Sequence, residues 1–123
     1  MFEVMIEDSF AAAHRLLNYD GICENQHGHN WRVQVFAKGL NLDNAGILVD
    51  FKVLHGALRK VLKDFDHTDL NTLDAFKSLS PSSELIARHI YEQLKPEITN
   101  ISKVTVWETE KSSATYYCEN CND

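Results

Sequence analysis

The stretch CENQHGHNWRVQV, residues 23–35, combines the alternation of a β-strand with three side chains of the types that bind metals. Because successive side chains of a strand point to opposite faces, His27 and His29 share one face with Trp31. The other face is polar, with Asn30, Arg32 and Gln34. This is the pattern of a half-buried antiparallel strand, and it predicts a strand over about 27–38 that presents two imidazoles to one side.

The rest of the chain predicts one α+β unit around this strand. Alternating apolar residues predict further strands over about 2–14, 102–109 and 113–118. Apolar residues at three- and four-residue spacing predict a helix over about 52–65 and a second helix that starts at SPSSE, with Ser80 as N-cap and Pro81 at the first helical position. The order ββααββ predicts a four-stranded antiparallel sheet with two helices on one face.

Length and charge exclude several classes of function. The chain has 123 residues, enough for one compact domain, and a formal net charge of -6, which argues against binding to duplex nucleic acid. There is no apolar run near 20 residues, so no membrane span is expected. The first ten residues carry acids where a signal peptide carries bases, so we expect a cytoplasmic protein.

The cysteines give a weaker signal. There are three of them, Cys23, Cys118 and Cys121, an odd number in a chain with no visible secretion signal. We therefore expect reduced cysteines rather than a disulfide framework. The Cys-x-x-Cys at 118–121 stands without a second pair, and we expect residues 118–123 to form a chemically idle tail.

Two imidazoles on one face of a strand can reach the same ion. Zinc takes imidazole nitrogens at about 2.0–2.1 Å in tetrahedral geometry. A third ligand must come from a neighbouring strand, and His14 at the end of the first strand is the best candidate because consecutive strands commonly pair. Three histidines leave the open fourth position of a catalytic site. Cys23 is then a fourth ligand, a thiolate activated beside the metal, or a small buried residue.

Two further features carry ionisable groups. Asp66 and His67 place a carboxylate and an imidazole in one loop, where the carboxylate can orient the ring for proton transfer near neutral pH. Glu108 continues the apolar face of Val104 and Val106. A carboxylate on such a face needs a partner, and a ligand edge with two N–H groups suits it, unless the strand ends before Glu108 and leaves it in water.

Six motifs occur in a characteristic order: SFAAAHRL, CENQHGH, GILVDF, DHTDLN, SPSSE and VWET. With this order and spacing the chain resembles the 6-pyruvoyl-tetrahydropterin synthase family from about Phe2 to Tyr117. It is most similar to the branch of 6-carboxy-5,6,7,8-tetrahydropterin synthases of queuosine biosynthesis. The chain departs from the family at Ser82, where a threonine is common, and Glu24 adjoins Cys23 where one branch uses a glutamate in place of the cysteine.

The resemblance implies a T-fold (tunnelling fold) catalytic domain over 1–117. It implies Zn²⁺ on His14, His27 and His29, with Cys23, Asp66 and His67 as catalytic residues. It also implies that Glu108 anchors the pterin ring and takes part in the proton relay. In the family, trimers close a barrel of twelve strands and two trimers stack into a homohexamer, which agrees with the exposed strand edges expected of a lone sheet.

The implied activity is that of a lyase. The resemblance implies conversion of 7,8-dihydroneopterin triphosphate to 6-carboxy-5,6,7,8-tetrahydropterin, acetaldehyde and triphosphate. The triphosphate needs cationic partners; Arg15 and Lys52 are candidates, although we expect both on solvated faces. Three alternatives stay open, the first from the same family and the other two from the residues. They are a 6-pyruvoyl-tetrahydropterin synthase, a three-histidine zinc hydrolase or hydratase, and a structural module in which Cys23 closes a four-ligand zinc site.

Overall fold

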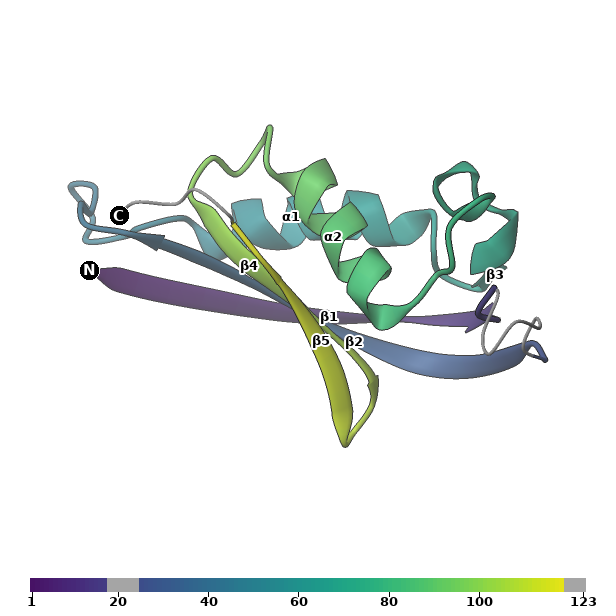
Figure 1. Cartoon of the computed structure of the whole chain (residues 1–123). Coiled ribbons are helices and arrows are strands. Elements are labelled where there is room, and N and C mark those ends of the chain that lie inside the picture. Colours follow the sequence, from purple (N-terminus) through teal and green to yellow (C-terminus); the bar gives the residue numbers. More distant parts are fainter. Residues whose placement is uncertain (18–24, 119–123) are drawn as a thin grey trace.

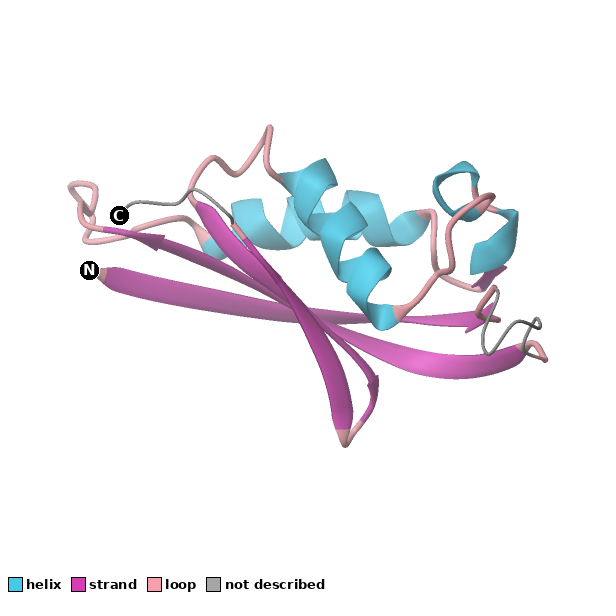
Figure 2. Cartoon of the chain, in the orientation of Figure 1, coloured by secondary structure: helices cyan, strands magenta, loops and turns pink. Residues whose placement is uncertain are grey.

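The computed structural model describes residues 1–17 and 25–118, and the expected strands and helices are present. The strands are β1 (Phe2–His14), β2 (His27–Gly39), β3 (Thr68–Asp69), β4 (Ile101–Thr109) and β5 (Ser112–Tyr117). The helices are α1 (Phe51–Lys63) and α2 (Ser83–Leu94), with the short 3₁₀ helices η1 (Leu70–Thr72) and η2 (Asp74–Phe76) between them. Figures 1 and 2 show both α-helices on one face of the twisted sheet.

The sheet has five strands in the order β3-β1-β2-β4-β5 and is mixed, so the expectation of four antiparallel strands is wrong. The additional strand, β3, pairs in parallel with β1 at Ala12 and Ala13. His67 takes the left-handed conformation (φ 59°) just before β3, and its N–H donates to the carbonyl of Ala11 at 2.6 Å. A two-residue strand is too short to leave a period-two pattern in the sequence.

The hydrophobic core fills the space between the sheet and the two helices. The sheet contributes Trp31, Val33 and Val106, all with no exposed surface. The helices contribute Leu58 from α1 and Ile90 from α2, also fully buried. Because the histidines of β2 share a face with Trp31, they lie on this same side of the sheet, at the edge of the core.

The start of α2 differs from the expectation. Ser82, not Ser80, is the N-cap: its hydroxyl accepts a hydrogen bond from the N–H of Leu85 at 3.2 Å. The hydroxyl of Ser80 is bonded instead to the backbone of Leu17, 63 residues earlier in the chain. A local capping pattern could not reveal that this long-range contact takes the first serine.

The pairing of β1 with β2 places the candidate ligands. The two strands are antiparallel in one continuous register over all of β1, which sets His14 directly opposite His27 and Ala12 opposite His29. Side chains at facing positions of an antiparallel pair lie close together. The end of β1, the start of β2 and β3 therefore meet at one end of the sheet, on the right in Figure 1.

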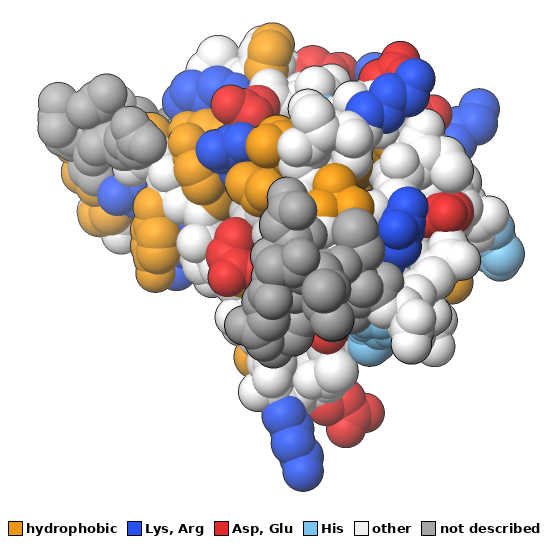
Figure 3. All heavy atoms as spheres, turned by 45° about the vertical axis from the view of Figure 1, so that its right-hand side comes forward, with side chains coloured by type: hydrophobic (Ala, Val, Ile, Leu, Met, Phe, Trp, Pro, Cys, Tyr) orange, Lys and Arg blue, Asp and Glu red, His pale blue; other side chains and the backbone are white. Residues whose placement is uncertain are grey.

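The surface is mixed in charge. On the face seen in Figure 3, acidic and basic side chains are interspersed and do not form one basic patch, in keeping with the net charge of -6. Over the part of the chain that the structure describes, no helix combines the length and apolarity needed to cross a membrane.

Candidate metal and active site

Four side chains from three strands converge at this end of the sheet. His14 of β1, His27 and His29 of β2, and Glu108 of β4 each offer one ligand atom, and these atoms all lie within 4.8 Å of one another. His14 is 1% exposed and Glu108 is 31% exposed, so the group runs from the core to the surface. An arrangement of three imidazoles and one carboxylate can bind a metal ion.

The ring contacts of His14 and His27 determine which nitrogens face the centre of the group. The Nδ1 of His14 lies 2.8 Å from the carbonyl oxygen of Pro81, and the Nδ1 of His27 lies 3.0 Å from that of Asn25. A carbonyl oxygen only accepts, so each of these contacts requires a proton on Nδ1, and a ring that carries its single proton there presents a lone pair at Nε2. The two Nε2 atoms are 3.1 Å apart. Two lone pairs at that distance repel, and a shared cation relieves the repulsion.

His29 and Glu108 complete the group around His14. The Nε2 of His29 lies 3.5 Å from one carboxylate oxygen of Glu108, and the Nε2 of His14 lies 3.4 Å from the other. These separations are those of groups that face a common centre, and they are too long for strong hydrogen bonds. Glu108 can therefore either join the histidines as a fourth ligand or turn its oxygens toward a bound molecule.

Trp31 contacts the imidazoles of His14 and His29 from the side of the hydrophobic core. Its ring centroid is 4.8 Å from that of His14 and 5.5 Å from that of His29, both nearly perpendicular. Trp31 is completely buried, and its indole N–H donates to the carbonyl of Ala12 at 3.2 Å. Contact with this rigid indole ring restricts the rotation of both imidazoles and so pre-organises the group.

The residue pattern by itself did not place Glu108 beside the histidines, although the resemblance to the family implied that they serve the same active site. The sequence placed Glu108 on the face of Val104 and Val106, and it placed the histidines on one face of their own strand. The pairing of β2 with β4, in which Val33 lies opposite Val106, brings the two faces together. Had that register been assumed, Glu108 would have fallen beside the histidine-bearing end of β2.

Asp66 and His67 lie at the edge of β1, outside the four-residue group. Asp66 Oδ1 accepts from the N–H of Ala11 at 2.9 Å and lies 3.2 Å from Nδ1 of His67. The Ala11 amide, and after it His67, hold the pKa of Asp66 below its usual value, against an opposing effect of desolvation. His67 is 83% exposed, yet it lines a hollow of about 400 Å³ together with His29.

The structure describes two of the four other candidate residues. Cys23 and Glu24 lie outside the described residues. Arg15 and Lys52 are both exposed, and Arg15 directly follows His14.

Cys118 differs from the expectation of reduced thiols. Cys118 is disulfide-bonded. Cys23 and Cys121 lie outside the described residues.

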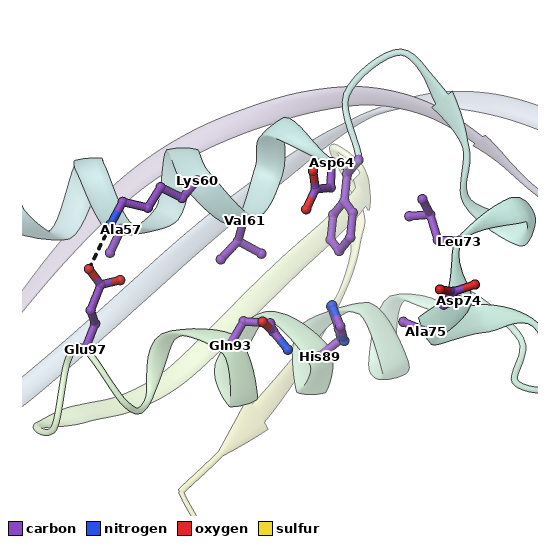
Figure 4. Close-up of a pocket in the computed structure, with 11 residues that line it drawn as sticks. Ala57, Lys60, Val61, Asp64, Leu73, Asp74, Ala75, His89, Gln93 and Glu97 are labelled. Carbon is purple, nitrogen blue, oxygen red and sulfur yellow. Dashed lines mark hydrogen bonds and ion pairs between the residues drawn. The ribbon is translucent and has the colours of Figure 1, made fainter.

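A larger pocket of about 580 Å³ lies between α1 and α2 (Figure 4). Its lining includes Phe65 and His89, whose ring centroids are 5.6 Å apart, and the Lys60–Glu97 ion pair of 3.0 Å. Burial lowers the pKa of His89, with a smaller opposing effect of Glu92. None of the four candidate metal ligands lines this pocket, so it is separate from the site.

The fold and the site define a class: a small α+β protein in which a sheet end covered by two helices carries three histidines and a glutamate able to bind a metal. Comparison with known families makes the class specific. The family model of 6-pyruvoyl tetrahydropterin synthase matches residues 3–119, and the chain belongs to this family.

Relatives and solved structures agree with this assignment. The chain is 35% identical to the 6-carboxy-5,6,7,8-tetrahydropterin synthase of Synechocystis, over 95% of this chain and 94% of the relative. It is 32% identical to the enzyme of the same name from Haemophilus influenzae, over 94% and 99%. The structure of Caenorhabditis elegans 6-pyruvoyl tetrahydropterin synthase superposes with a TM-score of 0.81 at 30% identity, covering 97% of this chain and 98% of that one. The protein is thus an enzyme of the tetrahydropterin synthase type, a lyase.

Proposed function

We propose that this enzyme converts 7,8-dihydroneopterin triphosphate and one water molecule to 6-carboxy-5,6,7,8-tetrahydropterin, acetaldehyde and triphosphate, in the biosynthesis of queuosine. The observation that carries the proposal is the convergence of three imidazoles and Glu108 at one end of the sheet. The names of the Synechocystis and Haemophilus influenzae relatives support the 6-carboxy product. The reaction needs a site that binds the substrate side chain and moves protons on and off its carbons.

Zinc is the metal we propose for His14, His27 and His29. The donor set supports it, because zinc favours imidazole and the two Nδ1 atoms bonded to carbonyls leave Nε2 atoms as ligands. Zinc bound there would supply Lewis-acid polarisation of substrate oxygen atoms. Glu108 stays available to the substrate in this arrangement, as its partial exposure permits.

Four protein groups act on the substrate in this proposal. Glu108 accepts hydrogen bonds from the pterin's 2-amino and ring N–H groups, a charge-assisted pair that fixes the ring. Cys23 exchanges protons at the substrate carbons as a thiolate. Asp66, whose pKa is lowered by the Ala11 amide, stays ionised and orients His67, which moves protons on the opposite side.

We further propose that residues 1–117 form one T-fold catalytic domain that assembles into a homohexamer of two trimers. β3 covers only Ala12 and Ala13 of β1 and leaves most of that edge without a strand beside it in the described chain. Phe51 and Val53 at the start of α1 are each 54% exposed, and burial between subunits would remove this apolar surface from water. Assembly would also complete a substrate site between subunits.

A 6-pyruvoyl tetrahydropterin synthase is the second candidate. A putative 6-pyruvoyl tetrahydrobiopterin synthase of Caenorhabditis elegans is 34% identical over 89% of each chain, as similar as the 6-carboxy relatives. This reaction also eliminates triphosphate but keeps all three side-chain carbons. The histidines and glutamate serve both reactions equally, so only the products distinguish them.

Product analysis with 7,8-dihydroneopterin triphosphate tests the proposal. We expect acetaldehyde and triphosphate to appear in equal amounts with a 6-carboxy pterin. Triphosphate without acetaldehyde, and a pterin with three side-chain carbons, would assign the 6-pyruvoyl reaction instead. Cys23→Ala should fold, bind zinc and make no product, because it removes a proton-transfer group and no ligand. Loss of zinc in this variant would favour the closed four-ligand site.

A further inference from the structure

The residues that follow β1 remain hydrogen-bonded along the same edge of the chain as β1 itself. In an extended chain, the N–H and C=O of every second residue point to the same edge. On this edge, β3 pairs with the chain around Ala13. Beyond it, at Arg15 and Leu17, two side chains from distant segments take the place of a neighbouring strand.

Asn71 and Ser80 are these two side chains. Asn71 Oδ1 accepts from the N–H of Arg15 at 2.9 Å, and its Nδ2 donates to the carbonyl of Arg15 at 3.0 Å. Ser80 Oγ accepts from the N–H of Leu17 at 2.6 Å and donates to the carbonyl of Leu17 at 3.1 Å. Each side chain thus satisfies both backbone groups of one residue, as a paired strand would do.

These contacts bear directly on His14. Asn71 holds the residue after His14, and Ser80 is followed by Pro81, whose carbonyl oxygen lies 2.8 Å from Nδ1 of His14. The Ser80–Leu17 bonds tie the segment that follows β1 to the segment that carries this carbonyl. Because His14 is 1% exposed, its ring has no water to replace the Pro81 oxygen if that segment shifts.

We propose that Ser80, together with Asn71, is a positioning residue for His14. Ser80 sets the Pro81 carbonyl against Nδ1, which fixes the ring in the tautomer that directs the Nε2 lone pair toward His27 and Glu108. Asn71 holds the backbone at the adjacent position. The inference rests on the proposed function only in that the ring so oriented is a zinc ligand. Groups that orient a metal-binding imidazole typically change metal affinity by about 10–100-fold.

Zinc affinity of Ser80→Ala, measured by competition with a chromophoric chelator, tests the proposal. We expect a dissociation constant raised about 10–100-fold. Ser82→Ala is the matched control, because it removes another serine hydroxyl two residues away, the N-cap of α2, without touching Leu17. It should unfold more easily and bind zinc as the wild type does. Ser80→Thr keeps the hydroxyl and should restore the affinity.

A second measurement reads the tautomer itself. The Nδ1–H of His14 should give a protected imidazole NMR signal in the wild type and in Ser82→Ala, and a weakened one in Ser80→Ala. Wild-type affinity together with a wild-type signal in Ser80→Ala would overturn the proposal. If wild-type protein binds no zinc, the proposed metal site fails, and the NMR signal alone decides the role of Ser80.

Asn71→Ala keeps the proposal testable if Ser80→Ala does not fold. We expect its zinc affinity also to fall, by up to about tenfold, the lower end of the effect of an orienting group. The matched control is Thr72→Ala, which removes a local hydroxyl bond to the carbonyl of Asp69 at 2.7 Å and touches no backbone of β1. Equal zinc affinity of Asn71→Ala and the wild type would overturn the proposal.

Discussion

Replacing His29 by alanine should remove most of the stabilisation that zinc gives to the fold. His29 is the best of the three histidines for this test because it is 20% exposed, whereas His14 is 1% exposed and bonded to Pro81. Truncation of His14 would leave a buried carbonyl without its donor and would damage the fold directly. His29→Ala changes the ligand set with a smaller effect on the core.

The expected size follows from mass action. Free zinc at about 100 times the wild-type dissociation constant stabilises the folded state by about 2.7 kcal/mol. A variant that binds about 100-fold more weakly keeps only about 0.4 kcal/mol at the same zinc concentration. For a chain of 123 residues the unfolding entropy is about 0.26 kcal/mol/K, so zinc should raise the Tm of the wild type by about 10 °C and that of His29→Ala by less than about 2 °C.

The assay is thermal unfolding followed by circular dichroism, with the same free zinc or with a chelator. His55→Ala is the control, because His55 is a histidine of α1 outside the four-residue group, and this variant should keep the full zinc effect. The reasoning is refuted if zinc raises the Tm of His29→Ala as much as that of the wild type. A wild-type Tm that does not respond to zinc would refute the metal site itself.

Three further outcomes are expected. Glu108→Gln should weaken pterin binding by about 2 kcal/mol, roughly 30-fold, because Glu108 is 31% exposed and the pair is only partly desolvated; unchanged binding in calorimetry would contradict its role as anchor. Because burial lowers the pKa of His89, folding stability should fall as pH drops from about 6.5 through the lowered folded-state pKa. Urea unfolding of His89→Gln should show a smaller loss over that range, and an equal loss would be contrary evidence. Sedimentation should give a hexamer, and a monomer at active concentrations would exclude the assembly.

Local patterns along the chain were enough to predict the main elements. Alternation predicted the strand at 2–14, and β1 covers those same residues. Alternation also placed His27 and His29 on one face, because the side-chain period of a strand depends only on the backbone. The consecutive pairing of β1 and β2 followed from proximity in sequence, and it brings His14 opposite His27.

Contacts between distant segments were beyond such patterns. The sequence predicted Ser80 as the N-cap of α2, but Ser80 is hydrogen-bonded to the backbone of Leu17 and Ser82 caps the helix. The two-residue β3 leaves no periodic signal, so the sheet appeared antiparallel.

The site shows the same division. Residue types and spacing named the three histidines and Glu108, because the chemistry of a ligand belongs to its side chain. Their meeting depends on the β2–β4 register and on the Pro81 carbonyl that orients His14. Such contacts are decided by the free energy of packing the whole chain, in which each long-range pairing must offset the entropy of closing its loop.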